Sequence, residues 1–228
     1  MGSLIRPTRR NTLADEIYES VRTLVMDHVV APGERINIDA LARQLQVSPT
    51  PVREALARLE ADGLVTKRPL AGYTATALLT RAQFDELIEM RLILECAAAQ
   101  RAAGRAAAGH LPGADLTALR EAANLPDPVP GANGFAGIAA FTAQDARFHH
   151  RLAEQAGNRM LYEAVVRLRS HLHLFRLHFP TSHHGPSASE HHHVVDAVVA
   201  GDPDAARAGM RAHLLSARDR HLPFFETR

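Results

Sequence analysis

The sequence predicts a mainly α-helical protein, in which an N-terminal winged helix-turn-helix with a small β-hairpin wing precedes a C-terminal all-α helical bundle. Three observations predict this class. Alanine is abundant and aromatic residues make up only 5% of the chain, which favours packed helices over a β-sandwich. Apolar residues recur at helical spacing over most of the 228 residues. Strand-like segments occur at one place, where "LVTK" and "YTAT" flank "RPLAG".

The first two predicted helices lie near the N-terminus. Thr12 is expected to cap the first one, with Asp15 completing a weaker form of the capping box. The segment "APGE" then ends this helix. The segment "IDALARQL", residues 38–45, predicts a second, short helix, and "QVS" connects it tightly to the next element.

A third helix is expected to begin at Thr50 or Pro51. Thr50 can accept a hydrogen bond from a free backbone N–H group, and Pro51 suits the first turn because its missing N–H group is not needed there. Gly63 supplies the stop, and the two strands follow. Helix, short helix, tight turn, helix and hairpin are, in this order, the elements of a winged helix-turn-helix.

The remaining chain shows helical patterns only, interrupted by a segment rich in glycine, proline and alanine. These patterns cover residues 84–105, 116–123, 141–156, 160–179, 190–200 and 203–220. We therefore expect a winged helix-turn-helix domain over residues 1–78, with residues 1–11 as a flexible arm. An all-helical domain over residues 79–228 follows it.

Composition narrows the classes of protein. The formal net charge is only +1, so any basic surface for nucleic acid must be local. Cys96 is the single cysteine and cannot form an internal disulfide bond, which fits a reducing cytoplasm. We find no signal peptide and no apolar run long enough to span a membrane. The expected location is the cytoplasm.

The start of the third helix carries the donors that a helix needs in the major groove of DNA. Ser48 and Thr50 offer hydroxyl groups, which can hold phosphates together with the free amides of the helix N-terminus. Arg53, on the exposed end, can make a bidentate contact to guanine or clamp a phosphate. The alternative is that Thr50 and Pro51 only cap the helix, with Arg53 in solvent.

The segment "VSPTPVREALARLEADGLV" resembles the N-terminal domain of the GntR family of bacterial transcription regulators, within a match from about Leu13 to Thr76. In that family the matching positions meet DNA, which implies a DNA-binding role for Ser48, Thr50, Pro51, Arg53 and Gly72. Lys67 and Arg68 enter the hairpin, where a wing would touch the DNA backbone.

Four polar residues of the helical half are predicted to face inward. Asp145 and His149 lie four residues apart on an apolar helix face. His191 precedes three valines at helical spacing, and His213 lies on the apolar face of the last long helix. Three imidazoles and one carboxylate on three helices can close around a transition metal. The alternative is a set of core polar groups that are hydrogen-bonded separately.

This half of the chain resembles the FadR-type C-terminal effector domain called FCD, from about Phe84 to His221. The segments "FDELIEMRLILECAAAQRAA", "DARFHHRLAEQAGNRML" and "SEHHHVVDAVVAGDPDAARAGMRAHL" carry the resemblance. In the family, the residues that match these four bind the metal, and His191 is chosen over its histidine neighbours because it follows Glu190. A nitrogen-rich set favours Zn or Ni over Mg or Ca.

Two further residues are expected at an effector site. Arg91 lies on an inward helix face, and an inward arginine needs an anion. The family position that matches it lines the effector cavity, so we expect Arg91 to grip the carboxylate of a small metabolite. The alternative is an internal salt bridge, for example to Glu95. Asn158 matches a family Gly-Asn position and either contributes to effector binding or caps the next helix.

We therefore expect a one-component transcription regulator and not an enzyme. It would be a homodimer on a pseudo-palindromic operator, with a repressor favoured by the resemblance, and a small carboxylate in the metal cavity would change its grip on DNA. One alternative is a metal-dependent hydrolase or oxygenase with an accessory DNA-binding module, although no general base is placed by a motif. The other is a DNA-binding regulator whose metal is purely structural.

Overall fold

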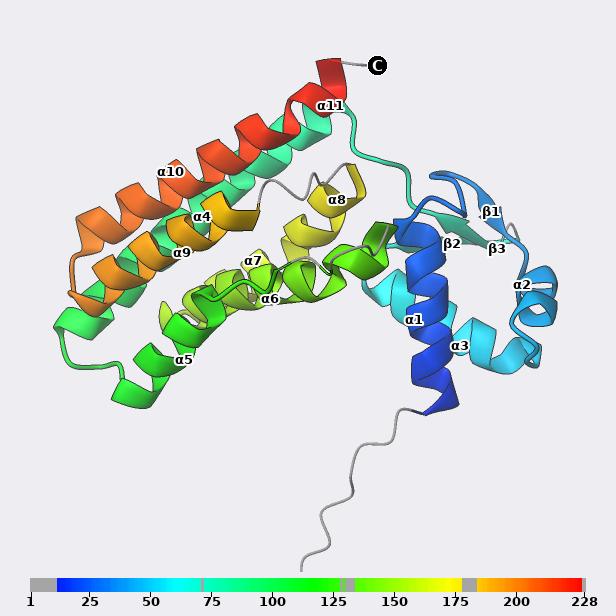
Figure 1. Ribbon diagram of the computed structural model, residues 1–228, viewed down its shortest axis with the longest axis horizontal. Coiled ribbons are helices and arrows are strands. Elements are labelled where there is room, and N and C mark those ends of the chain that lie inside the picture. Colours follow the sequence, from blue (N-terminus) through cyan, green and yellow to red (C-terminus); the bar gives the residue numbers. More distant parts are fainter. Residues whose placement is uncertain (1–11, 71, 128, 130–133, 178–183, 227–228) are drawn as a thin grey trace, which may run out of the picture. The chain divides into compact units, whose positions relative to one another are not determined.

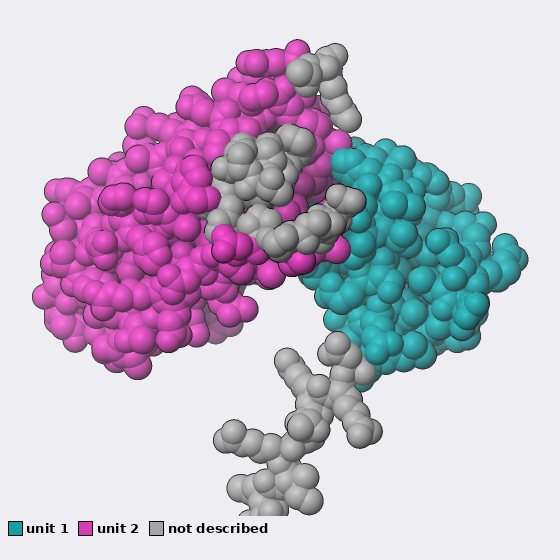
Figure 2. Space-filling model, in the orientation of Figure 1, with its two compact units in different colours: residues 1–77 teal, residues 78–228 magenta. Residues whose placement is uncertain are grey.

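The computed structural model describes residues 12–70, 72–127, 129, 134–177 and 184–226, and the predicted arm of residues 1–11 lies outside them. The chain divides into two compact units, Met1–Ala77 and Leu78–Arg228, which Figure 2 shows in different colours. The predicted division lay one residue later, after Leu78. The predicted fold class is confirmed, because three helices and a small sheet precede a unit whose described elements are all helices.

The first unit is a helix-turn-helix with a three-stranded antiparallel sheet of order β1-β3-β2 (Figure 1). Its elements are α1 (Leu13–Met26), β1 (Arg35–Ile36), α2 (Ile38–Gln44), α3 (Pro49–Ala61), β2 (Val65–Arg68) and β3 (Gly72–Ala75). The predicted capping box at the start of α1 is confirmed, since Thr12 and Asp15 each accept a backbone hydrogen bond from the other. Helix α1 packs against α3 through fully buried side chains, among them Val21, Val52 and Leu56.

Two details of this unit differ from the prediction. Helix α3 begins at Pro49 with Ser48 as its N-cap, so Thr50 lies inside the first turn and does not cap the helix. Strand β1 was not predicted. It has two residues, Arg35 and Ile36, and exists because these pair with Thr74 and Tyr73 of β3. A strand this short has no alternation of its own, and only the long-range pairing defines it.

The second unit is a bundle in which α4 packs against α10, α9, α6 and α7, while α6 also contacts α5 and α8 (Figure 1). Its helices are α4 (Arg81–Ala107), α5 (Gly113–Ala123), α6 (Gly134–Gln155), α7 (Arg159–Leu168), α8 (Ser170–Leu177), α9 (His184–Val199), α10 (Pro203–His221) and α11 (Pro223–Glu226). None of the described helices is long and apolar enough to cross a membrane.

Three helix boundaries of this unit were predicted wrongly. The single helix expected over residues 160–179 is two helices, because Arg169 adopts a left-handed conformation with φ of 47° and ends α7. Helix α6 begins at Gly134 rather than at Phe141. Its first turns contain glycines that resemble a loop, but burial of Phe135 outweighs their low helix propensity. Helix α9 begins at His184, six residues before the predicted start, with Pro186 in its first turn.

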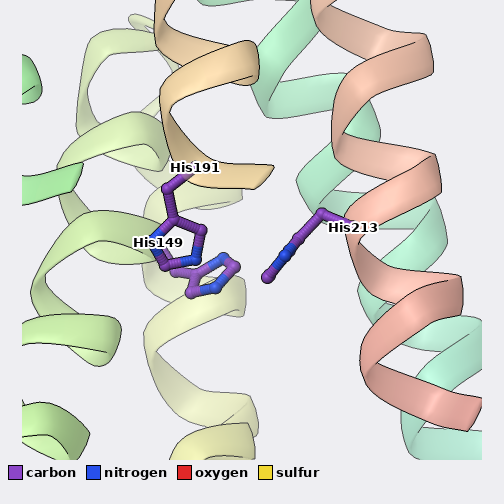
Figure 3. Close-up of side chains that lie close together, drawn as sticks. All are labelled: His149, His191 and His213. Carbon is purple, nitrogen blue, oxygen red and sulfur yellow. The ribbon is translucent and has the colours of Figure 1, made fainter. Parts of the chain in front are cut away.

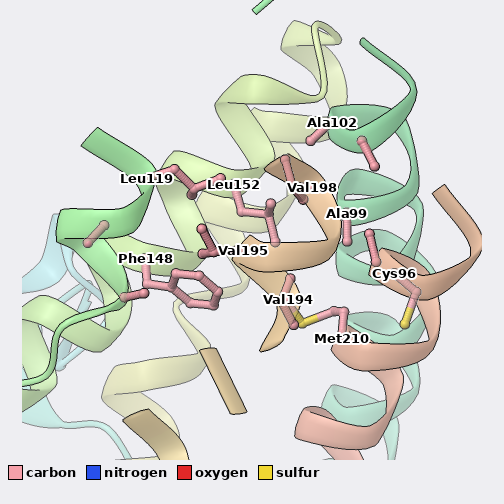
Figure 4. Packing of buried hydrophobic residues seen from close by; sticks show 14 of the residues in the cluster. Cys96, Ala99, Ala102, Leu119, Phe148, Leu152, Val194, Val195, Val198 and Met210 are labelled. Atoms are coloured by element: carbon pink, nitrogen blue, oxygen red, sulfur yellow. The ribbon is translucent and has the colours of Figure 1, made fainter. Parts of the chain in front are cut away.

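The main core of this unit lies among α4, α6, α9 and α10 (Figure 4). Small residues of α4, such as Ala99, let the larger side chains of the other three helices approach closely. Phe148, Val194 and Met210 fill the centre and are fully buried. Cys96 belongs to this cluster, as its apolar sequence context indicates. Because the polar residues described below come from these four helices, the core fixes their positions.

Candidate DNA interface and metal centre

The N-terminal end of α3 presents polar side chains to solvent. Ser48, Thr50 and Arg53 are exposed, whereas Pro51 is half-buried. The Ser48 side chain makes no capping hydrogen bond, so its hydroxyl group is available to another acceptor or donor. Arg53 makes no hydrogen bond or ion pair with any described residue. A free arginine and a helix N-terminus that lacks a side-chain cap form a site suited to phosphates and base edges.

The wing is the hairpin of β2 and β3. Lys67 and Arg68 are exposed on β2, and Arg68 pairs with Gly72 at the end of the ladder. Gly72 has φ of +80°, a conformation that strains any other L-residue, and a Cβ atom there would meet nothing within 4 Å. Glycine is therefore required at this position by backbone geometry and not by crowding, and it lets β3 begin opposite the basic end of β2.

Three buried histidines of the second unit lie together (Figure 3). His149 of α6, His191 of α9 and His213 of α10 each offer one ring nitrogen, and these nitrogens all lie within 4.8 Å of one another. The ring centroids of His191 and His213 are 4.7 Å apart, and those of His149 and His213 are 5.2 Å apart. Residues that are separated by 64 positions in the sequence thus share one small space.

Asp145 lies at the edge of this cluster. Its Oδ1 atom is 3.5 Å from Nε2 of His191 and 3.9 Å from Nε2 of His149. Both distances exceed a normal hydrogen bond between a ring nitrogen and a carboxylate, so Asp145 lies beside two of the imidazoles without being hydrogen-bonded to them. The structure therefore brings together all four residues that the sequence analysis selected.

His191 makes the strongest case for a ligand. Its side chain is 0% exposed and its ring stacks on Phe148, yet neither ring nitrogen has a hydrogen-bond partner among the described residues. Burial first, and then the neighbouring cationic groups, holds the pKa of His191 well below its ordinary value. A neutral imidazole with two unsatisfied buried nitrogens costs free energy, and a bound ion would remove part of that cost.

Two carboxylates orient the other histidines, and sequence analysis assigned neither of them this role. Glu95 of α4 places Oε2 at 2.5 Å from Nδ1 of His149, and Glu190 of α9 places Oε2 at 2.8 Å from Nδ1 of His213. The hydrogen bond to Glu190 occupies Nδ1 of His213 and leaves Nε2 for another partner. Nδ1 of His149 lies close to Glu95 but does not meet the geometry of a hydrogen bond. Burial lowers the pKa of His213, although the hydrogen bond to Glu190 opposes that effect. A carboxylate behind a metal-binding imidazole is a recurrent arrangement in proteins.

A small cavity of about 30 Å³ adjoins the cluster, which is room for roughly one water molecule or ion. Its wall includes Arg91, Asp145, His149, His213 and Arg220. These five charged or imidazole side chains share the wall with apolar side chains, among them Phe141, Leu174 and Phe175.

Arg91 is buried in this wall and is already paired. Its Nε donates to Oε1 of Glu95 at 2.6 Å, which is the salt bridge that the sequence analysis left open. Its Nη2 also lies 3.4 Å from Nε2 of His149. Arg91 therefore lies where it can contact a ligand in the cavity, but such a contact would replace one of its present contacts with Glu95 or His149.

Asn158 lies elsewhere. It is exposed and caps α7, accepting a hydrogen bond from the backbone N–H of Leu161 at 3.1 Å. It does not belong to the cavity wall described above. The structure thus gives Asn158 the capping role that was the alternative in the sequence analysis.

A winged helix-turn-helix in one chain with a helical domain that contains a cavity lined by charged and imidazole side chains is the organisation of a one-component transcription regulator. Comparison with known protein families agrees. The model for bacterial regulatory proteins of the gntR family matches residues 13–74, and the FCD domain model matches residues 86–216. The chain belongs to the GntR family of transcription regulators, and its FCD domain fits the FadR-type subfamily.

Individual relatives cover most of the chain. The Nta operon transcriptional regulator of Aminobacter aminovorans is 30% identical over 191 residues, 84% of this chain and 86% of that protein. The HTH-type regulator YdhC of Bacillus subtilis is 26% identical over 200 residues, 87% of this chain and 86% of that protein. A crystal structure of a GntR regulator from Rhodococcus sp. RHA1 superimposes with a TM-score of 0.63 at 24% identity, covering 92% of this chain and 97% of that one.

These findings decide between the classes that the sequence left open. The matching families and the relatives named above are transcription regulators and not enzymes, which removes the hydrolase or oxygenase alternative. The protein is a DNA-binding transcription regulator of the GntR and FCD type.

Proposed function

We propose that this protein is a homodimeric repressor that binds a pseudo-palindromic operator. A small carboxylate, bound beside a divalent transition metal in the FCD domain, controls its affinity for that operator. The observation that carries the metal proposal is the buried, unsatisfied His191 between His149 and His213. A regulator of this kind acts where the chromosome is, so we assign it to the cytoplasm.

The DNA contacts follow from the exposed groups of the first unit. The N-terminal end of α3 enters the major groove, with Arg53 directed at a base edge or phosphate and the hydroxyl groups of Ser48 and Thr50 at phosphates. Pro51 belongs to the same interface, in the first turn of α3 between Thr50 and Arg53. Lys67 and Arg68 meet the backbone from the wing, and Gly72 lets the wing approach closely.

The metal ligands are a nitrogen of each of the three histidines together with a carboxylate oxygen of Asp145. Three imidazoles and one carboxylate suit Zn or Ni. When bound, the ion supplies a Lewis-acidic centre to which a carboxylate can bind directly. Burial lowers the pKa of both His191 and His213 and so favours the neutral imidazole, which is the form that binds a metal.

Arg91 links the metal to the effector. Its guanidinium group lies 3.4 Å from Nε2 of His149, so it has to move away when that nitrogen binds a cation. The cavity is then too small for a metabolite unless neighbouring side chains also shift. An effector that binds only the shifted arrangement changes the equilibrium between two forms of the domain, as allosteric control requires.

The test begins by selecting an operator from a random DNA pool. The affinity of the protein for this operator is then measured in three states. The first is stripped of metal by a chelator, the second is loaded with Zn, and the third is loaded with Zn in the presence of lactate, citrate or succinate. We expect at least one acid to weaken binding by the loaded protein alone, and Arg91→Lys to weaken that response because lysine lacks the guanidinium fork.

Two results would contradict the proposal in different ways. Identical operator affinity under all conditions, despite bound Zn, would make the metal purely structural. A mass in sedimentation equal to 24.8 kDa rather than twice that value would contradict the homodimer.

A further inference from the structure

We propose that Glu190 is a positioning residue for the metal site: it holds His213 in the tautomer that directs Nε2 toward the ion, and its bidentate pair with Arg220 holds the carboxylate in place. This inference rests on the proposed metal site and adds a residue that neither the family resemblance nor the sequence pattern selected for a role of its own.

Both carboxylate oxygens of Glu190 have hydrogen-bond partners. Arg220 donates from Nη1 to Oε1 at 2.8 Å and from Nη2 to Oε2 at 2.9 Å, a bidentate pair. Ser216 donates to Oε1 at 2.6 Å. His213 Nδ1 lies 2.8 Å from Oε2. The carboxylate thus has three partners on α10 and cannot rotate without breaking bonds.

Charge fixes the direction of the bond to His213. Arg220 pairs with both oxygens of Glu190 and the Ser216 hydroxyl donates to one of them, an arrangement that stabilises the ionised carboxylate. An ionised carboxylate only accepts hydrogen bonds, so Nδ1 of His213 must carry the proton. In a neutral imidazole the lone pair then lies on Nε2, which is the nitrogen available for the shared space.

A second, similar arrangement lies on another helix. Glu95 accepts from Arg91 and contacts Nδ1 of His149, so it too is a carboxylate held by an arginine and placed behind an imidazole. His191 has no such partner among the described residues. Of the three imidazoles, His213 thus has a hydrogen bond that sets its tautomer, and His149 has a carboxylate in the corresponding place behind its ring.

The competing explanation is that Glu190 only ties α9 to α10. That role would affect folding stability but would not set the tautomer of His213 or the affinity for metal. The variant Glu190→Met removes the acceptor at similar side-chain length. The matched control is Ser216→Ala, which removes one bond to Glu190 but leaves its charge and its contact with His213.

Two measurements on the full-length protein separate these explanations. Zinc affinity, obtained by competition with a chromogenic chelator, should fall about 10- to 100-fold in Glu190→Met and by less than about 3-fold in Ser216→Ala. In metal-free protein, imidazole ¹⁵N spectra should show His213 protonated at Nδ1 in the wild type, and a mixture of tautomers in Glu190→Met. Should Glu190→Met not fold, Glu190→Gln should still weaken zinc binding, by about 10-fold, since a hydrogen bond to a neutral acceptor is roughly half as strong.

The outcomes also separate this inference from the proposed function. Wild-type protein that binds no zinc, nickel or other late divalent ion contradicts the proposed metal site. Wild-type protein that binds zinc, with folded Glu190 variants whose affinity and His213 tautomer match the wild type, contradicts the inference alone.

Discussion

Replacing Arg53 with alanine tests the assignment of α3 as the recognition helix. The side chain is exposed at the N-terminal end of the helix and makes no hydrogen bond or ion pair with any described residue. Nothing in the folded unit therefore depends on it, and the substitution should change the free energy of unfolding by less than about 0.5 kcal/mol. Any loss of DNA affinity then reports on the DNA contact itself.

The expected loss follows from the number of contacts. A bidentate contact between an arginine and a base is worth about 1–3 kcal/mol. A homodimer on a pseudo-palindrome uses the residue twice, so the total is roughly 2–6 kcal/mol. That range corresponds to a loss of operator affinity from about 30-fold to more than 10⁴-fold.

The matched control is another arginine of the same helix. Arg58 lies near the C-terminal end of α3, forms an ion pair with Asp15 at 3.0 Å and stacks over the ring of Tyr18 at 4.2 Å. Its contacts are within the domain, so Arg58→Ala should lower the melting temperature slightly and leave operator affinity within about 3-fold of the wild type.

Fluorescence anisotropy with a labelled operator at fixed ionic strength gives both affinities, and circular dichroism confirms that helix content is unchanged. Equal affinity of Arg53→Ala and wild-type protein would refute the assignment. So would a larger loss for Arg58→Ala than for Arg53→Ala, because it would place the opposite end of α3 on the DNA.

Three other predictions test separate parts of the molecule. If Lys67 contacts a phosphate, Lys67→Ala should weaken binding to all DNA sequences and reduce the log–log salt slope by about 0.9 per DNA-binding head; an unchanged slope would argue against a wing contact. Burial first, and then the hydrogen bond to Asp62, raises the pKa of Tyr18 to about 12. The stability that follows from this shift is present below the unfolded pKa of about 10 and is lost as the pH rises toward 12. In urea unfolding, the free energy of unfolding of the wild type should therefore fall at alkaline pH, and that of Tyr18→Phe should not. Parallel pH profiles of the two proteins would contradict this prediction. The double variant His149→Ala/His213→Ala should carry metal only at background level by elemental analysis, and full stoichiometry would rule out this ligand set.

Local chemistry made much of this structure predictable from sequence. The Thr12 cap, the proline-rich start of α3 and the glycine stop after it depend on residues a few positions apart, and the structure places them within two residues of the prediction. The inward faces of α6, α9 and α10 followed from helical periodicity, because a buried face repeats every 3.6 residues. That periodicity is what brought His149 and His213 into consideration together.

Features that depend on distant contacts were not predictable. Strand β1 exists only through its pairing with β3, and the break at Arg169 interrupts a segment whose apolar pattern continues through it. The bond from His213 to Glu190 joins residues 23 positions apart on different helices, and no pattern within either helix indicates it. The sequence could not decide whether Arg91 binds an effector carboxylate or forms an internal salt bridge. An inward arginine needs an anion, but the sequence does not show which one.

Anomalous diffraction from crystals of zinc-loaded protein tests the central claim most directly. The proposed site predicts one peak per chain, with a nitrogen of His149, His191 and His213 each at about 2.0–2.1 Å from it and Asp145 turned toward it. Peaks confined to surface residues, with the three imidazoles left as they are here, would contradict it.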